Sequence, residues 1–184
     1  MAEKNGYLKS LSLKVASANY HRYMTVKGLN DTKIYPDPKL AAGSEFTAMM
    51  LTLHSCLDIL AQWINLEYNV GLKESEASLY KVIKKIKNET VKNQLIELKE
   101  ITTYLDDFCN YNKHRNIVQV KEYSYFVSQF QPYQSFDIDQ FERNGNSHPP
   151  QTLDYQENYQ YYLVTNQLNF ITGIDLIKYK TPDE

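Results

Sequence analysis

The 184-residue chain has only two cysteines, six glycines and six prolines, and it lacks any long uninterrupted run of apolar residues. No stretch approaches the ~18 uncharged apolar residues of a membrane-spanning helix, and residues 1–6 lead into no apolar core of the signal-peptide type. We therefore expect a cytoplasmic protein with no membrane partner. Cys56 and Cys109 fall inside expected helices, so we interpret them as small core residues rather than as a disulfide.

The chain also lacks an excess of either charge, because 20 Lys and Arg stand against 22 Asp and Glu, for a net charge of -2. This balance gives no global attraction for nucleic acid or an anionic membrane. RNA binding must therefore be local, and DNA binding is not indicated. The sequence contains no Gly-rich phosphate loop, and no Cys or His pair recurs at the spacing of a metal site. We predict neither a metal nor a cofactor.

What the chain does contain is enough apolar material for one core. Hydrophobic residues make up 42% of the sequence and charged residues 23%, which excludes wholesale disorder, and 16 residues are Tyr. A chain of roughly 150 residues or more buries about two-thirds of its unfolded surface without disulfides or metals. We therefore predict a single domain over residues 1–184.

Apolar residues recur at helical spacing in two long segments. The first runs from Ser44, a suitable N-cap, to about Asn69, before a glycine that can end the helix. The second opens at Asn88 or Thr90 and continues to about Arg115. The residues expected to face inward are Phe46, Met50, Leu53, Leu57, Leu60 and Ile64 on the first, and Leu95, Leu98, Ile101, Leu105 and Phe108 on the second.

Shorter or less regular segments complete the expected fold. We predict helices over about 6–27, from about Ser75 to Ile86, and over about 152–179, with a loop at 32–40. Residues 117–150 begin with alternating β-branched and aromatic side chains, which favours a hairpin or an extended edge, and then become polar. The fold class is therefore all-α, an up-and-down bundle of four to five helices with an irregular or short β excursion before the last helix.

Polar chemistry is concentrated at the end of the second long helix, in Asn110-Tyr111-Asn112-Lys113-His114-Arg115. Four residues advance a helix by a full turn plus about 40°, so Asp106, Asn110 and His114 share one face. A histidine transfers protons near neutral pH, an amide orients a phosphate or ribose oxygen, and Lys113 or Arg115 neutralises a phosphate. The alternative is an ordinary helix C-terminus, where cations are favoured by the helix dipole and Asn assists capping.

A second polar feature lies on the first long helix, at His54, Asp58, Gln62, Asn65 and Asn69. If the two long helices pack as antiparallel neighbours, this polar line faces the Asn110 cluster. A hydrogen bond from His54 or Asp58 to His114 would then fix the tautomer of that ring. The alternative is that this side of the helix simply faces water.

The order of these elements and the Asn110 to Arg115 cluster resemble the HEPN superfamily of bacterial and archaeal helical bundles. The cluster is similar to an Asn-and-Lys-His-Arg signature in uncharacterised branches of that superfamily. In ribonuclease members of that superfamily an Arg is paired with a His four to six residues later in the same chain, and two protomers bring these motifs together across a dimer interface. This chain keeps His114 but has no Arg upstream on that helix, where Asp107, Phe108 and Cys109 stand, with Asn110 nearer. The resemblance therefore implies a fold and a homodimer more than catalysis.

Three functional interpretations remain open at this point. The first is a non-catalytic, homodimeric helical module that binds a nucleotide or RNA through Asp58, Asp106, Asn110 and the cluster up to Arg115. The second is a metal-independent, toxin-like ribonuclease in which His114 is catalytic and Lys113 or Arg115 replaces the missing Arg. The third is a purely structural bundle in which Asn110 and His114 tie helices together.

Overall fold

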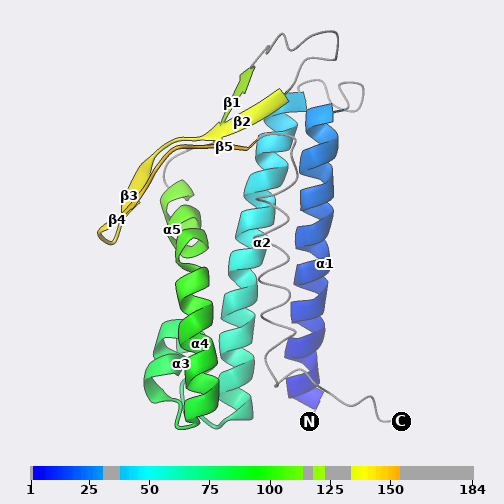
Figure 1. Ribbon diagram of the computed structural model, residues 1–184. Coiled ribbons are helices and arrows are strands. Elements are labelled where there is room, and N and C mark those ends of the chain that lie inside the picture. The colour runs from blue at the N-terminus through cyan, green and yellow to red at the C-terminus, as the bar shows by residue number, and fades with distance from the viewer. Residues whose placement is uncertain (1, 31–37, 114–117, 123–133, 154–184) are drawn as a thin grey trace.

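In the computed structural model, residues 2–30, 38–113, 118–122 and 134–153 are described. Within that part of the chain, the helices are α1 (Ala2–Asn30), α2 (Pro38–Glu67), the 3-10 turn η1 (Glu74–Glu76), α3 (Leu79–Lys85), α4 (Glu89–Ile101) and α5 (Thr103–Asn112). Helices α1 and α2 run antiparallel, and α4 and α5 return along α2 as one nearly straight column (Figure 1). The predicted up-and-down bundle with a short β excursion is confirmed. None of the described helices combines the length and the apolar character needed to cross a membrane.

The excursion forms two small antiparallel sheets built from β1 (Val118–Glu122), β2 (Gln134–Ile138), β3 (Phe141–Arg143), β4 (Asn146–His148) and β5 (Gln151–Leu153). One sheet has the strand order β1-β2-β5 and the other pairs β3 with β4. Arg143 pairs with Asn146, which leaves a two-residue turn of Asn144 and Gly145 with φ values of 53° and 82°. Positive φ at both positions is the type I′ turn that Asn-Gly favours. We call β3, β4 and this turn the hairpin, and it leans over the end of α5 (Figure 1).

The core lies between α2 and the α4–α5 column. All six α2 residues expected to face inward are buried, and so are Leu95, Leu98, Leu105 and Phe108. The rings of Phe46 and Phe108 meet edge to face with centroids 5.8 Å apart, which joins α2 directly to α5. This contact fixes the position of α5, the helix that carries the polar cluster.

The prediction of one continuous helix from residue 88 to 115 was wrong, because the chain breaks at Thr102. The hydroxyl of Thr102 donates to the carbonyl of Leu98 at 2.8 Å, and that of Thr103 donates to the carbonyl of Lys99 at 2.9 Å. Such bonds from threonine to the preceding turn bend helices. Thr102 is buried and Ile101 is 40% exposed, so the expectation that Ile101 faces inward was also wrong.

Three predicted ends differ from the structure. Helix α2 begins at Pro38 rather than at Ser44. Proline is favoured in the first turn of a helix, because the N–H groups there have no partner within the helix and the missing N–H of proline costs no hydrogen bond. The short helix begins after Ser78, whose side chain accepts the Lys81 amide, rather than near Ser75. The last helix was expected from about Thr152, but residues 151–153 form β5 and pair with β2. The rest of that predicted helix, 154–179, lies outside the described residues.

Other local predictions are confirmed. Residues 6–27 lie within a helix, and the side chain of Asn88 accepts the Val91 amide at 3.1 Å as the N-cap of α4. Cys56 and Cys109 are both buried and free of a disulfide. Burial raises the pKa of the Cys56 thiol to about 11 and that of Cys109 to about 12, so both remain protonated at neutral pH.

Candidate functional site

The cluster face of α5 meets the polar line of α2 at Asp106. The Asn110 side-chain amide donates to Asp106 Oδ1 at 3.0 Å and to the Asp106 carbonyl at 2.9 Å, so these two residues share a face as expected. His54 Nε2 lies 2.9 Å from the same Oδ1. The polar line of α2 therefore reaches α5, and its partner within the described residues is Asp106.

The remaining predicted site residues are placed as follows. Asp58 is exposed one turn along α2 from His54, and Lys113 is the exposed C-cap of α5. Farther down α2, Asn65 bonds both the amide and the carbonyl of Leu72 at 2.9 Å and so shapes the loop after the helix. His114 and Arg115 lie outside the described residues, and a bond from His54 or Asp58 to His114 stays a prediction.

The carboxyl group of Asp106 has a lowered pKa. The hydrogen bond from His54 is the largest cause, and the charge of His54, the Asn110 amide and the charge of Arg143 act in the same direction, whereas partial burial opposes them. Asp106 is therefore a carboxylate at neutral pH, held as an acceptor by two donors.

This lowered pKa gives a prediction for His54→Ala. Removing the ring takes away the main cause, so the Asp106 pKa should rise toward its ordinary value of 3.8. Because the folded pKa is the lower one, the stabilisation by the pair is complete above about pH 4 and disappears as the pH falls through the folded pKa. Carboxyl-carbon NMR titration measures the shift.

His21→Ala is the matched control for this titration. His21 Nδ1 lies 2.7 Å from Glu45 Oε2, between α1 and α2, so its removal also breaks a histidine and carboxylate pair. It should leave the Asp106 titration unchanged. An equal rise in both variants would contradict the assignment of the shift to His54.

The neighbouring Asp107 lies in a buried polar cluster with the hairpin, at the edge of the same groove. Its side chain is 2% exposed. The Asn144 amide donates to Oδ1 at 3.1 Å, the Asn146 amide donates to Oδ2 at 2.9 Å, and His148 Nε2 lies 3.0 Å from Oδ2. Buried carboxylates need such donors to offset the loss of water. Asp107 therefore fastens the hairpin to α5 by polar contacts, beside the ring contacts that Phe141 makes with Tyr104 and Phe108.

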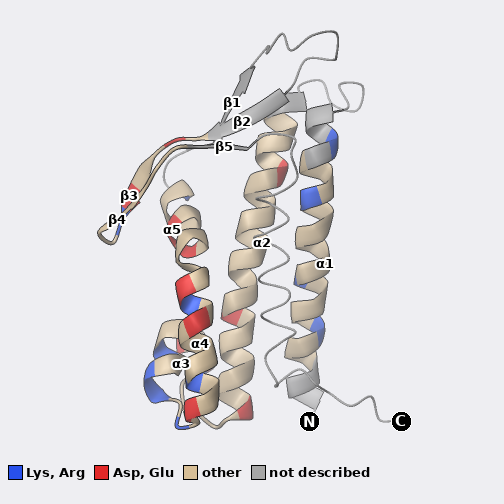
Figure 2. Cartoon of the chain, viewed as in Figure 1, with Lys and Arg blue, Asp and Glu red and all other residues tan. Residues whose placement is uncertain are grey.

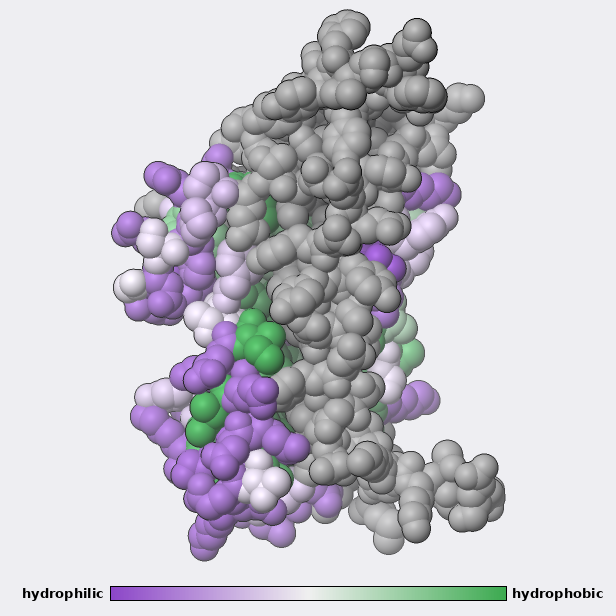
Figure 3. Space-filling view, in the orientation of Figure 1, coloured by the Kyte–Doolittle hydropathy of each residue, from purple (hydrophilic) through white to green (hydrophobic). Residues whose placement is uncertain are grey.

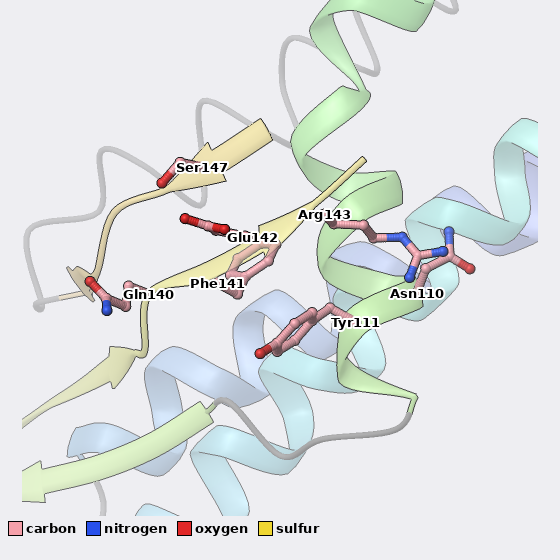
Figure 4. A pocket seen from close by; sticks show the side chains of 7 residues that line it. All are labelled: Asn110, Tyr111, Gln140, Phe141, Glu142, Arg143 and Ser147. Atoms are coloured by element: carbon pink, nitrogen blue, oxygen red, sulfur yellow. The ribbon is translucent and has the colours of Figure 1, made fainter. Parts of the chain in front are cut away.

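Arg143, at the end of β3, is brought beside the α5 cluster by the same contacts. Its Nε lies 3.9 Å from Asp107 Oδ1, beyond hydrogen-bonding distance, and this buried nitrogen has no hydrogen-bond partner among the described residues. The guanidinium runs toward the side-chain amide of Asn110 (Figure 4). Helix α5 contains no Lys or Arg of its own. Arg143 therefore brings a cation from the hairpin to the face of α5 that carries Asp106 and Asn110.

Two hollows meet at Asn110. The hairpin cavity, of about 620 Å³, lies between α5 and the hairpin and is lined by Asn110, Tyr111, Phe141 and Arg143 among others (Figure 4). The central groove, of about 640 Å³, lies between α2, α3 and the α4–α5 column, and its polar lining includes His54, Asp58, Lys99, Asp106, Asn110 and Asn146. The space-filling view shows the surface hollowed below the hairpin (Figure 3).

Sequence reasoning singled out His54, Asp58, Asp106 and Asn110 as candidates, but it gave no reason to bring Asp107, Arg143 and His148 together. His148 contacts the buried carboxylate of Asp107 at 3.0 Å. The missed signal was Asn144-Gly145, which marks a two-residue hairpin turn and so places residues 143 and 146 opposite each other. Among the described residues, no three His, Cys, Asp or Glu side chains gather in a metal-binding arrangement.

Long antiparallel helices followed by a short β excursion fit a HEPN-like helical protein. The family model described as Cthe2314-like HEPN matches residues 46–160, from α2 to beyond β5. Because the match covers more than half of the chain, the protein belongs to this HEPN family. Comparison with curated proteins and with solved structures gave no match.

Proposed function

We propose that this HEPN protein is a non-catalytic module that binds a nucleotide unit of RNA in the central groove. The observation that carries the proposal is the arrangement around Asp106 and Asn110. An ionised carboxylate and an amide face a groove that adjoins a cation at Arg143 and contains another at Lys99. Carboxylates accept from ribose hydroxyls and base N–H groups, amides read base edges, and Arg and Lys hold phosphates.

The charges of the groove decide which part of a nucleotide lies where. Asp58 and Asp106 line its middle, and a phosphate there would be repelled. The sugar and base therefore lie against Asp106 and Asn110, and the phosphate lies toward Arg143. Lys113, His114 and Arg115 follow in the sequence and are the further candidates for phosphate contact. Figure 2 shows the acidic residues along α5.

The absence of an Arg on α5 supports a binding role over catalysis. The positions where the HEPN ribonuclease motif would place it are occupied by Asp107, Phe108 and Cys109, all of them buried. Asp107 fastens the hairpin, and the other two belong to the core. This stretch of the helix serves packing, which leaves binding to Asp106 and Asn110.

Homodimerisation is part of the proposal, and α1 supplies a surface for it. Leu13, Tyr20 and Tyr23 are 62%, 58% and 57% exposed and lie on one side of the helix. Apolar side chains gathered on a protein surface are typical of interaction sites. Light scattering should give twice the 21.6 kDa protomer mass, and Leu13→Asp should give a single protomer.

Arg143 gives a specific reason to keep ribonuclease activity as the second candidate. It supplies from the hairpin the cation that the α5 motif lacks, as Lys113 or Arg115 was expected to do. In such cleavage the ribose 2′-oxygen bonds to phosphorus, the bond to the 5′-oxygen breaks, His114 accepts the 2′ proton, and the leaving oxygen gains one. Arg143 would stabilise the charge on the phosphoryl oxygens.

One set of variants tests these functions. Isothermal titration with 5′-mononucleotides should show micromolar binding that is lost in Asn110→Ala and His114→Ala and kept in Lys85→Ala, an exposed lysine of α3. Total RNA should stay intact with every protein. Cleavage that disappears in both His114→Ala and Arg143→Ala would instead establish the ribonuclease. No binding, no cleavage, and a melting temperature lowered by several degrees in His114→Ala would favour the structural bundle.

A further inference from the structure

A second charged site lies on α3, at the far end of the central groove. Tyr80 is 52% exposed, with the Lys84 ammonium 4.1 Å and the Lys99 ammonium 5.0 Å from its ring centroid. The two lysines come from different helices, α3 and α4, and converge on one ring. The hydrogen bond and charge of Lys84, with the charge of Lys99, lower the pKa of the Tyr80 hydroxyl.

Neither ammonium group forms an ion pair with a described carboxylate, although Glu100 lines the same cavity. Residues 81–87 contain four lysines and no acidic residue, and Figure 2 shows this basic patch on α3. Within the described residues no carboxylate forms an ion pair with Lys84 or Lys99, whereas Lys92 pairs with Glu89 at 3.3 Å. Like charges held near one ring repel each other unless an anion lies between them.

These residues line a cavity of about 340 Å³, which we call the lysine cavity. Tyr80, Lys99 and Thr103 line both this cavity and the central groove, so the two are continuous. On the surface over α3 to α5, hydrophobic residues interrupt hydrophilic ones (Figure 3). Lys81 and Lys85, which lie on α3 like Lys84, line neither hollow. Lys84 and Lys99 therefore differ from the lysines of α3 that line no hollow.

The two ends of this continuous surface are too far apart for one phosphate. Lys99 and Asn110 are eleven positions apart, or roughly 16 Å along the α4–α5 column at 1.5 Å per residue. A ligand that contacts both must be extended, with a sugar and base at Asp106 and Asn110, one phosphate toward Arg143 and another at Lys84 and Lys99. Exposed aromatic rings flanked by cations are how proteins hold single strands, by stacking a base and neutralising the backbone.

We propose that Tyr80, Lys84 and Lys99 form a second subsite, which holds a phosphate and an adjoining base of single-stranded RNA whose neighbouring nucleotide lies at Asp106 and Asn110. This inference rests on the proposed function and makes the ligand an oligonucleotide rather than a mononucleotide. RNA is favoured over DNA because a 2′-hydroxyl can donate to the Asp106 carboxylate.

The test measures binding of a fluorescent ten-nucleotide single-stranded RNA by polarisation across a salt series. The double variant Lys84→Ala/Lys99→Ala should bind more weakly, and its slope of log affinity against log salt should be shallower by about 0.7, the value for one lost phosphate contact on a single strand. Tyr80→Ala should weaken binding by about fivefold or more, through loss of one stacked base. The control is Lys81→Ala/Lys85→Ala, which removes the same charge from outside the cavity. Melting curves verify that each variant is folded.

The outcomes separate this inference from the proposed function. If mononucleotides bind but the two double variants have equal slopes, the second subsite is overturned and the function stands. If mononucleotides do not bind but RNA binding still depends on Lys84 and Lys99, the subsite stands and the groove function fails. Equal affinity for DNA of the same sequence overturns the assignment to RNA. An absence of RNA binding overturns the subsite.

Discussion

Replacing Phe108 with alanine should lower the free energy of unfolding by about 3–5 kcal/mol, the usual cost of removing a buried aromatic ring. Phe108 has no exposed surface and joins three elements of the fold. Its ring meets Phe46 of α2 at 5.8 Å, Tyr104 of α5 at 6.2 Å and Phe141 of the hairpin at 6.4 Å. Urea denaturation measures the loss, and the melting temperature should fall by about 6–20 °C for a domain of this size.

Ile101→Ala is the control for Phe108→Ala. Sequence periodicity places both residues on the inner face, but Ile101 is 40% exposed in the structure. Its replacement should therefore cost well under half as much. Equal losses in the two variants would mean that the helix does not break at Thr102.

Asp107→Ala should have the second large effect, lowering the free energy of unfolding by about 3 kcal/mol. Loss of one partner from a buried charged cluster leaves the others without their bonds. The donors left are the Asn144 and Asn146 amides and the His148 ring. The hairpin should then separate from α5, and trypsin should cut after Arg143 faster than in the unmodified protein.

Asp106→Ala tests whether the effect belongs to the contacts of Asp107 with the hairpin or follows the loss of any carboxylate on α5. The Asp106 side chain is 53% exposed and pairs with His54, so its loss should cost under about 1 kcal/mol and leave cleavage after Arg143 unchanged. Fast cleavage in Asp106→Ala, or none in Asp107→Ala, would contradict the assignment of the clamp to Asp107.

Much of the fold could be predicted because local patterns decide it. In α2 the spacing of Phe46, Met50 and Leu53 alone identifies the buried face, and all three are buried. The break at Thr102 could not be predicted in this way. Ile101 fits the helical period, and what overrides it is the pair of threonine hydroxyls bonding to the preceding turn.

Only those contacts of the candidate site that follow from helix geometry could be predicted from the sequence. Asp106 and Asn110 are one turn apart, so their contact follows from their spacing. The approach of His54 required only that α2 and α5 be neighbours. Arg143 and His148 come from a hairpin whose docking depends on Asp107, a charged residue that periodicity gives no reason to bury. Their approach is a tertiary property of the chain.

The clamp at Asp107 also bears on the order in which the protein folds. Its three donors lie 37, 39 and 41 positions later in the chain. A loop of that length closes at an entropic cost that only completed contacts recover, and those contacts need an α5 already packed on α2. The hairpin should therefore dock after the helices assemble, which makes the Arg143 side of the groove the last part to form during refolding and the first to be lost during unfolding.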